Sequence, residues 1–406
     1  MSDEFAKKII EDFPLLKVGG LAYLDTAATS QTPQVVLNAM NNYYTKFRAN
    51  IHRGLYAISE EATAQYEQAR KDVAGFIGAQ EDEIIFTAGA TASSNMLIYS
   101  LEQTLELHAG DEIVTTIMEH HASLVPLQEL AKRKQLVLKH ISITKDLELD
   151  YESAQKLITP KTKIVSVMLA SNVTGTINDV AQIAKKAHDV GAVVIVDATA
   201  AVGHISVDVK KLDADFIYFS GHKMCGPTGV GVLYGKKERL EILHPSFFGG
   251  GMIDSVTKND ATWAKDISRF EAGTPNIAGV IGLGCAVNYL QTVDIEKIHE
   301  HVREVFSYAY EKLSEIKGMK LLCEKYPQKN VGIISFDVDG VHSHDMAQIL
   351  AGEKVAVRAG HHCAMPLIQE ISVVSTVRAS FYFYSTKADV DALVSAIKKA
   401  QDIFSK

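Results

Sequence analysis

A lysine surrounded by glycines follows an apolar segment near the middle of the chain. Lys223 lies in SGHKMCGPTG (220–229), directly after DFIYFS (215–220). A lysine in this setting can be desolvated enough to become a neutral amine and to form a Schiff base with a carbonyl compound. The alternative is a solvated loop lysine, which is the usual state of a lysine taken at random.

A carboxylate at the end of another apolar segment favours the reactive interpretation of Lys223. Asp197 ends AVVIVD (192–197). Ligands of open α/β sheets bind at the carboxyl ends of the strands, so we expect Asp197 and Lys223 to face one crevice. A carboxylate opposite a pyridinium nitrogen keeps that nitrogen protonated and makes the ring an electron sink. The alternative role for Asp197 is a helix cap.

A turn between a predicted strand and a predicted helix could bind a phosphate group. Residues 89–91 follow EIIFT (83–87), so backbone N–H groups and the Thr91 hydroxyl can face an anion at the positive end of the helix. Ser220 and His222 offer further donors beside the lysine, and the turn of residues 273–275, which contains Thr274, is another possible donor. Many turns of this kind look alike, and the signal is weak when taken alone.

Two further groups of polar residues lie at predicted strand ends. MEHH (118–121) follows DEIVTTI (111–117), and one imidazole of His120 and His121 could stack on a pyridine ring or move protons, although a lone histidine is more often structural. Arg378 in VRASFYFY (377–384) could bind a substrate carboxylate with both guanidinium arms. Its alternative role is a surface ion pair.

One cysteine has polar neighbours that suit nucleophilic chemistry. Cys363 lies in RAGHHCAMP (358–366), where an arginine and two histidines would favour the thiolate. The alternative is a buried free thiol that packs as a small hydrophobe. We prefer that alternative for Cys285 and Cys323.

The elements that must position these residues form a doubly wound α/β pattern. Short apolar runs alternate with segments of helical period, as in a mainly parallel sheet buried on both faces. The segment 178–191 is predicted to be a helix that opens with an Asn178 cap and stops at a glycine. After about Val293 the pattern changes to that of a smaller α+β domain. We therefore predict an N-terminal segment 1–23 that packs with the small domain, a large domain 24–293 and a small domain 294–406.

Composition excludes several classes of protein. A chain of 406 residues usually divides into two domains. The net charge of −8, with scattered Lys and Arg, argues against nucleic acid as a partner. Four separated cysteines without a C-x-x-C pair, and no secretory signal ahead of them, indicate a reduced cytoplasmic protein without a cysteine metal site. No apolar run approaches the roughly 20 residues of a membrane helix.

Taken together, the motifs resemble one family closely: the class V aminotransferase-fold cysteine desulfurases, in particular the SufS-like group marked by RxGHHCA. The resemblance extends over nearly the whole chain. It rests on LDTAATS (24–30), NIHRG (50–54), MEHHA (118–122), SNVTGTI (171–177), SGHKMCGPTG (220–229), FEAGTPN (270–276) and RAGHHCAMP (358–366). The resemblance implies a fold type I enzyme that uses pyridoxal 5'-phosphate.

Residue roles follow from the same resemblance. It implies that Lys223 holds the cofactor covalently, that His120 stacks on its ring and that Asp197 contacts the pyridine nitrogen. The remaining implied contacts are Asn172 beside cofactor and substrate, Thr91, Ser220 and His222 on the phosphate, Thr274 from the partner subunit of a homodimer, Arg378 on the substrate carboxylate, Arg358 near the nucleophile Cys363, and His52 and Arg53 at the dimer-side entrance.

Three positions depart from the family pattern. The family glutamine that bonds the phenolic oxygen of the cofactor is replaced by Ala200, and two family carboxylates are replaced by Ala92 and Gly251. These changes bear on cofactor tuning and on rate. The lysine, the aspartate, the ring histidine and the thiol are all present, which favours an active enzyme.

The resemblance implies conversion of L-cysteine to L-alanine, with the sulfur held on Cys363 as a persulfide. The persulfide would pass to an acceptor protein of SufU or SufE type for iron–sulfur cluster assembly, and the turn VHSHD (341–345) resembles the segment with which some relatives engage a SufU-like acceptor. Three alternatives stay open. They are a selenocysteine lyase, a weakly active cofactor-binding partner in sulfur transfer, and a metal-dependent hydrolase that uses His120, His121, Asp197, His361 and His362.

Overall fold

The large domain is built on a mainly parallel sheet. The computed structural model describes residues 2–404, and in this part of the chain seven strands form one sheet in the order β2-β8-β7-β6-β5-β3-β4. Strands β3 to β7 run parallel, and β8 runs antiparallel to β7 and to β2. The bounds are β2 (Ile84–Thr87), β3 (Glu112–Thr116), β4 (Val137–Ile141), β5 (Thr162–Met168), β6 (Val193–Asp197), β7 (Phe216–Ser220) and β8 (Gly231–Gly235). The predicted doubly wound α/β fold is confirmed.

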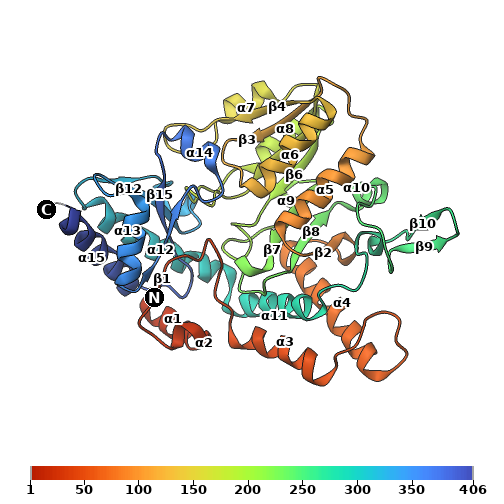
Figure 1. Cartoon of the computed structure of the whole chain (residues 1–406), viewed down its shortest axis with the longest axis horizontal. Coiled ribbons are helices and arrows are strands. Elements are labelled where there is room, and N and C mark those ends of the chain that lie inside the picture. The colour runs from red at the N-terminus through yellow and green to blue at the C-terminus, as the bar shows by residue number, and fades with distance from the viewer. Residues whose placement is uncertain (1, 405–406) are drawn as a thin grey trace.

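Helices cover both faces of this sheet. One buried cluster joins it to α5 and α6, and another joins it to α4, α8 and α11, with α3 packed on α11. Figure 1 shows α3, α4 and α11 in the lower part of the molecule, and α6, α7 and α8 in the upper part, beside β3, β4 and β6. The bounds are α3 (Gln34–Lys46), α4 (Ala57–Ile77), α5 (Ala90–Thr104), α6 (His121–Lys134), α7 (Tyr151–Leu157), α8 (Val180–Asp189), α9 (Val209–Leu212), α10 (Lys237–Ile242) and α11 (Ile277–Val293).

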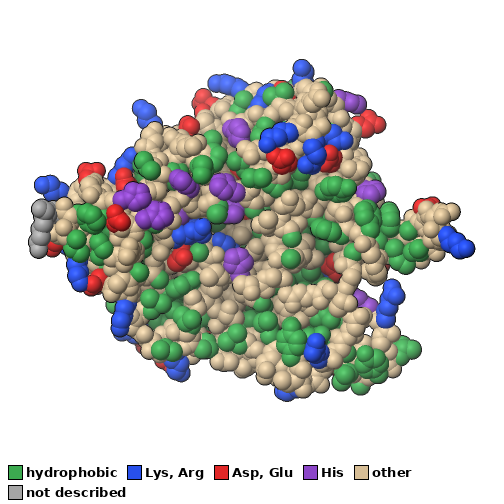
Figure 2. Space-filling view, viewed as in Figure 1, with side chains coloured by type: hydrophobic (Ala, Val, Ile, Leu, Met, Phe, Trp, Pro, Cys, Tyr) green, Lys and Arg blue, Asp and Glu red, His purple; other side chains and the backbone are tan. Residues whose placement is uncertain are grey.

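Hydrophobic side chains also reach the surface on the lower side of the molecule. Figure 2 shows them over α3 and over the loop that leads into α4. Leu55 is 95% exposed and Tyr44 and Tyr56 are each 54% exposed. These side chains leave apolar surface exposed over α3 and before α4.

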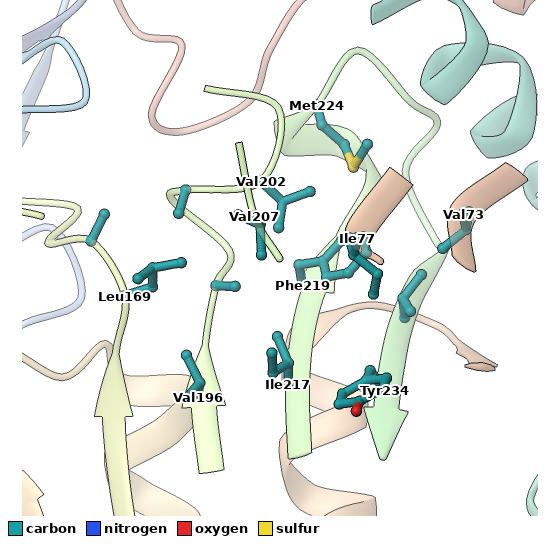
Figure 3. Packing of buried hydrophobic residues seen from close by; sticks show 14 of the residues in the cluster. Val73, Ile77, Leu169, Val196, Val202, Val207, Ile217, Phe219, Met224 and Tyr234 are labelled. Atoms are coloured by element: carbon teal, nitrogen blue, oxygen red, sulfur yellow. The ribbon is translucent and has the colours of Figure 1, made fainter. Parts of the chain in front are cut away.

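The strand residues alternate between the two faces of the sheet, and this alternation determines the face to which Asp197 belongs. Val194 and Val196 pack in the cluster with α4 and α11, whereas Val193 and Ile195 pack in the cluster with α5 and α6. Figure 3 shows the first of these clusters between the ends of β6, β7 and β8 and helix α4. By the same alternation Asp197 belongs to the face that α5 and α6 cover, at the carboxyl end of the sheet.

The C-terminal part of the chain forms a second, antiparallel sheet in the order β11-β12-β15-β14. Its hydrophobic cluster draws on α12, α13 and α15, and Figure 1 shows it on the left with the C-terminus. The bounds are α12 (Ile295–Ser314), β11 (Met319–Leu321), β12 (Ile333–Val338), α13 (Ser343–Gly352), β13 (Val355–Ala356), β14 (Arg358–Gly360), α14 (Met365–Glu370), β15 (Thr376–Ser380) and α15 (Lys387–Phe404).

Both ends of the chain meet at this second sheet. Strand β1 (Ala22–Tyr23) pairs with β13, and helix α1 (Ser2–Ile10) contacts α12 and is followed by α2 (Pro14–Lys17). A hairpin of β9 (Ile253–Val256) and β10 (Ala261–Trp263) projects from the large domain, which sequence reasoning did not predict. The domain boundaries 23/24 and 293/294 stay predictions.

One predicted helix cap was assigned to the wrong residue. The cap of α8 is Asp179, whose carboxylate accepts from the Gln182 N–H at 3.2 Å. The Asn178 side chain instead donates to the Met168 carbonyl at 2.9 Å. Asp and Asn are equally good caps, so sequence alone does not separate two neighbours.

Within the described residues, no single helix has both the length and the apolar composition of a membrane span, and α11 and α12 pass this test only as a pair bent by 73°.

Candidate active site

A cavity of about 210 Å³ lies at the carboxyl ends of the parallel strands. It draws residues from the ends of β5, β6 and β7, from the start of α5 and α6, and from β14 of the second sheet. The predicted side chains that line it are Thr91, His120, Asn172, Asp197, Ser220, His222, Lys223 and Arg358. Residues far apart in the sequence therefore meet where the strand-end argument placed them.

Lys223 lies in a short helical turn directly after β7, and its amine donates a hydrogen bond to the Ala27 carbonyl. Burial, followed by the positive charges of Arg378 and Arg358, lowers the pKa of Lys223 to about 7, although Asp197 acts in the opposite direction. Desolvation and like charge both disfavour the ammonium form. A large fraction of the amine is therefore neutral, and nucleophilic, near pH 7.

This pKa makes the loading of the apoprotein depend on pH in a defined way. Only the neutral amine attacks an aldehyde, so the rate at which pyridoxal 5'-phosphate becomes attached should rise through pH 7 and level off above about pH 8. Stopped-flow absorbance measures this rate. A rate that continues to rise to the ordinary lysine pKa of 10.5 would contradict the desolvated state.

Asp197 ends β6 as a buried carboxylate that is 4% exposed. Its Oδ1 accepts from the Thr199 N–H at 2.9 Å. Burial raises the pKa of Asp197, while the hydrogen bond from the Thr199 N–H and the charge of Lys223 oppose this shift. A buried carboxyl group of this kind can pair with a cationic ring nitrogen, whose charge would favour the carboxylate.

His120 caps the N-terminus of α6, and its Nδ1 accepts from the Ala122 N–H at 3.0 Å. Burial, followed by the Lys223 charge, lowers the pKa of His120 to about 4. The ring is therefore neutral near pH 7. A neutral imidazole on the cavity wall can stack on an aromatic ring without adding charge.

The predicted phosphate donors meet at the start of α5. The Ala90 N–H donates to the Ser220 hydroxyl at 2.8 Å, and His222 Nδ1 pairs with the Thr29 hydroxyl at 3.2 Å. Burial, followed by the Lys223 charge, lowers the pKa of His222 to about 4, so this ring contributes a neutral hydrogen bond. Backbone N–H groups and hydroxyls at a helix N-terminus suit a phosphate.

Thr274 does not line this cavity. It lies exposed in the turn before α11, and the same turn is anchored by Glu271, which accepts from the Phe86 N–H at 2.7 Å and from two Arg70 nitrogens at 2.8 and 2.9 Å. His52 is also exposed and pairs with Glu67 at 2.8 Å. The predicted roles of Thr274, His52 and Arg53 at a subunit boundary stay predictions.

Cys363 lies in the loop between β14 and α14, beside Arg358, which lines the cavity. Its Sγ lies 3.7 Å from Arg358 Nη2, and its carbonyl accepts from the His121 N–H at 2.7 Å. His362 and Cys363 both have left-handed φ values, of 52° and 58°. Such a backbone is strained for residues with side chains, and it gives the loop a sharp bend at the thiol.

The two histidines beside Cys363 have partners other than the thiol. His361 Nε2 pairs with the Val374 carbonyl at 3.0 Å, and His362 Nε2 pairs with the Thr376 hydroxyl at 2.8 Å. Burial lowers the pKa of His362 to about 2, so it carries no positive charge near pH 7. The expectation that His362 favours the thiolate was therefore wrong, because its neutral ring holds the loop while Arg358 lies beside the sulfur, and the expectation for His361 stays a prediction.

Arg378 is fully buried on β15, which excludes the alternative of a surface ion pair. Its Nη1 donates to the Asn172 carbonyl at 2.8 Å and its Nη2 to Asp25 at 3.2 Å, while Nε has no partner among residues 2–404. Burial lowers the pKa of Arg378 to about 10, and Asp25 opposes this shift. The Asn172 amide donates to the His362 carbonyl at 2.8 Å.

Of the three departures from the family pattern, Ala200 lies in this cavity. The neighbouring Thr199 hydroxyl is buried and has no hydrogen-bond partner in the described part of the chain. Ala92 lines a different cavity of about 250 Å³ beside the Thr274 turn, and Gly251 adopts φ 90°. The polar group nearest in sequence to the missing glutamine is therefore a threonine hydroxyl.

Residues 2–404 contain no group of three or more His, Cys, Asp and Glu side chains arranged to hold a metal ion. The five residues of the hydrolase alternative thus do not form one centre.

Sequence reasoning missed three contributors to the site. Asp25 bonds Arg378, the Ala27 carbonyl accepts from Lys223, and Glu119 lies fully buried beside His120. The first two fall in LDTAATS, which was recognised only as a motif. Glu119 could have been recognised from its position, because it is a charged residue between an apolar segment and His120.

The donor set fits pyridoxal 5'-phosphate. Lys223 supplies an amine of lowered pKa, Asp197 a buried anion, and His120 a neutral ring. The unpaired Asn172 Oδ1 and Thr199 Oγ1 leave buried polar atoms free on the same wall. Buried polar atoms of native sites normally have a partner, so these two indicate a polar ligand.

Comparison with known proteins agrees with this chemistry. Residues 22–393 match the family Aminotransferase class-V, whose members depend on pyridoxal phosphate. A probable cysteine desulfurase of Staphylococcus aureus strain Mu50 is 49% identical over 403 residues, which cover 98% of this chain and 97% of that protein.

Solved structures agree as well. The apo cysteine desulfurase of Thermococcus onnurineus NA1 superposes with a TM-score of 0.94 at 39% identity and covers 99% of both chains. The cysteine desulfurase CsdA of Escherichia coli, in its S-sulfonic acid form, gives 0.91 at 38% identity and covers 98% of this chain and 99% of that one. The chain therefore belongs to the cysteine desulfurases of the Aminotransferase class-V family.

Proposed function

We propose that the protein converts L-cysteine to L-alanine and receives the sulfur on Cys363 as a persulfide. The observation that carries this proposal is that one cavity contains Lys223 with a lowered pKa and Asp197, while Arg358 joins the wall of this cavity to the Cys363 sulfur at 3.7 Å. In the reaction the substrate Cβ–S bond breaks and a bond between the two sulfurs forms. Cβ gains a proton, and the sulfur is transferred without an external oxidant.

Pyridoxal 5'-phosphate, when bound, withdraws electrons from the substrate Cα and so makes its proton acidic. Lys223 would take this proton, and its pKa of about 7 supports this role because it lets the amine act as a base and then as an acid near neutral pH. Asp197 would hold the ring nitrogen and His120 the ring face. Ser220, His222 and Thr91 would hold the phosphate.

Arg378 is the proposed anchor of the substrate carboxylate. It is already oriented by Asn172 and Asp25, and its Nε has no partner within residues 2–404. Arg378→Lys keeps the charge and loses the planar fork. We expect the KM for cysteine to rise about 10- to 100-fold, which matches the roughly 1.5–3 kcal/mol of a hydrogen bond to a charged group. Steady-state rates over a range of cysteine concentrations measure this, and an unchanged KM would place the carboxylate elsewhere.

The proposed assembly is a homodimer. Thr274 is exposed and lies outside the cavity of its own chain, and the surface over α3 and the start of α4 is apolar (Figure 2). A partner subunit would cover this surface and bring its own Thr274 to the phosphate. Sedimentation measurements of the holoprotein test the mass of the particle.

The proposed acceptor of the persulfide is a protein of SufU or SufE type, in the cytoplasm, on the route to iron–sulfur clusters. Figure 2 shows histidine side chains grouped at the surface left of centre, in the region where Figure 1 places α13 and α14. His342 and His344 at the start of α13 are exposed, and their rings stack at 5.4 Å. A metal-containing acceptor could be recognised by such imidazoles.

An assay for alanine and sulfide formed from L-cysteine, with and without an acceptor, tests the proposal. Selenocysteine in the same assay separates a desulfurase from a selenocysteine lyase. Alanine formed only from selenocysteine would favour the lyase. Tight cofactor binding with negligible turnover of either substrate would favour the weakly active partner in sulfur transfer, which the replacement of glutamine by Ala200 motivates.

A further inference from the structure

A second carboxyl group, Glu119, lies close to Asp197, and the proposed chemistry does not use it. Glu119 follows β3 directly before His120 and is 0% exposed. Its Oε1 accepts two hydrogen bonds, from the Thr116 hydroxyl at 2.8 Å and from the Met168 N–H at 2.9 Å. Its Oε2 is buried and has no hydrogen-bond partner among residues 2–404. A buried charge on an unpaired oxygen would be costly.

These hydrogen bonds connect two parts of the proposed cofactor site. Met168 ends β5 and is the register partner of Asp197 across β5 and β6. Glu119 therefore ties the turn that carries His120 to the strand beside Asp197. The Glu119 carboxyl group fixes the spacing between the residue that would stack on the ring and the residue that would hold the ring nitrogen.

The surroundings of Glu119 favour its neutral form. Burial, followed by the negative charge of Asp197, raises the pKa of Glu119 to about 8. The hydrogen bonds from the Thr116 hydroxyl and the Met168 N–H to Oε1, and the nearby Ser123 hydroxyl on α6, act in the opposite direction, and the net shift of the pKa is upward. Near pH 7 the proton is therefore bound, and Oε2 is the oxygen free to carry it.

Asp197 is in the better position to keep the negative charge. Burial raises the pKa of Asp197, but this carboxylate accepts from the Thr199 N–H and lies near the Lys223 amine, and both of these lower its pKa. Tyr218, the register partner of Asp197 on β7, is fully buried, and burial and the two carboxyl groups raise its pKa far above the ordinary value. The tyrosine thus stays neutral as well.

We propose that Glu119 is a positioning residue that works as a neutral carboxylic acid: it holds the His120 turn against β5 and leaves Asp197 as the single anion facing the ring nitrogen. The protonated group keeps the Oε1 carbonyl as the acceptor for Thr116 and Met168. An ionised Glu119 would repel Asp197 and weaken its hold on a proton-bearing ring nitrogen. The inference rests on the proposed role of Asp197.

Infrared spectroscopy of the holoprotein tests the protonation state directly. At pH 6 to 7 the wild type should show a carbonyl band of a protonated carboxylic acid that Glu119→Gln lacks. The glutamine keeps the carbonyl acceptor and is neutral at every pH. If the substitution removes no such band, Glu119 is ionised and the inference fails.

The pH dependence of stability gives a second, independent readout. Glu119 has an ordinary pKa of 4.5 when unfolded and about 8 when folded, so the folded state binds the extra proton between these values. Stability of the wild type is therefore lost as pH rises from about 4.5 to about 8. Glu119→Gln should not show this loss, because the glutamine side chain does not titrate. The ratio of the two folding equilibrium constants should grow by up to about tenfold per pH unit in this window and level off above it.

A matched control lies at the start of β3, the strand that precedes Glu119. Glu112 is also buried, but Lys139 and two threonines lower its pKa, although burial opposes them. Glu112→Gln should therefore lose stability relative to the wild type as pH rises from acid values, which is the opposite sign. The inference fails if the difference in stability between Glu119→Gln and the wild type does not depend on pH. It also fails if this difference changes with pH in the same direction as that of Glu112→Gln.

The positioning role has its own test. Glu119→Leu is neutral but has no acceptor for Met168 and Thr116. It should shift the pH titration of the bound cofactor's absorbance and weaken cofactor retention on dialysis, whereas the glutamine should restore both toward the wild type. Equal behaviour of Leu and Gln would contradict positioning. All of these measurements are made without cysteine, so a protein that lacks desulfurase activity would count against the proposed function alone.

Discussion

Replacement of Lys223 by alanine is expected to reduce alanine formation from cysteine by on the order of 10⁴-fold or more. The lysine is proposed both to attach the cofactor and to move the Cα proton, and loss of a proton-transferring group alone commonly costs 10²–10⁴. The structure supports this role because burial and two arginines hold the pKa of Lys223 at about 7. Alanine production over time and the visible absorbance of the purified protein measure the effect.

Two controls separate chemistry from folding. Lys223→Arg retains a cation and cannot attach the cofactor, so it should be as inactive as the alanine variant. Lys210→Ala, in the exposed short helix α9, should behave as wild type. Borohydride should fix the cofactor to Lys223 in the wild type and not in either Lys223 variant. Attachment at another lysine would contradict the assignment.

Replacement of Cys363 by serine is expected to abolish persulfide formation and leave cofactor binding intact. The thiol lies in the loop between β14 and α14, and it contacts the site through Arg358 rather than through the residues proposed to hold the cofactor. Alanine formation from cysteine should fall by an amount comparable with the 10²–10⁴ of other lost catalytic groups. The yellow colour should be retained.

Cys285→Ser is the matched control for this prediction. Cys285 is a half-buried thiol on α11, far from β14, and burial raises its pKa. This variant should form the persulfide at the wild-type rate. Full desulfuration of cysteine by Cys363→Ser would show that another group receives the sulfur, whereas residual activity on selenocysteine alone would not.

The fold and the central residues of the site were predictable because both depend on local sequence. Apolar runs such as AVVIVD identify strands buried on both faces, and a parallel sheet brings their carboxyl ends together. The amino-acid sequence alone therefore suffices to place Asp197, Lys223 and His120 in one crevice, and all three line the same cavity.

The remaining features depend on contacts between segments far apart in the chain. Arg378 and Asp25 meet because the segment that follows β1 forms a bridge to β15 between Asp25 and Ser380. His362 lies next to Cys363 in the sequence, which suggested a part in catalysis. In the structure its ring pairs with Thr376, in a loop whose backbone is left-handed at His362. Side-chain direction in such a loop is not encoded in spacing, so the wrong expectation for His362 could not have been corrected from sequence.

The central claim is that sulfur from cysteine is bound by Cys363. Mass spectrometry of the peptide that contains Cys363, after the holoprotein has reacted with one equivalent of L-cysteine without reductant, tests it most directly. The account predicts the added mass of one sulfur atom on Cys363, in amounts that match the alanine formed. Alanine formed in equal amount with an unmodified Cys363, or with the added sulfur on Cys285, would contradict it.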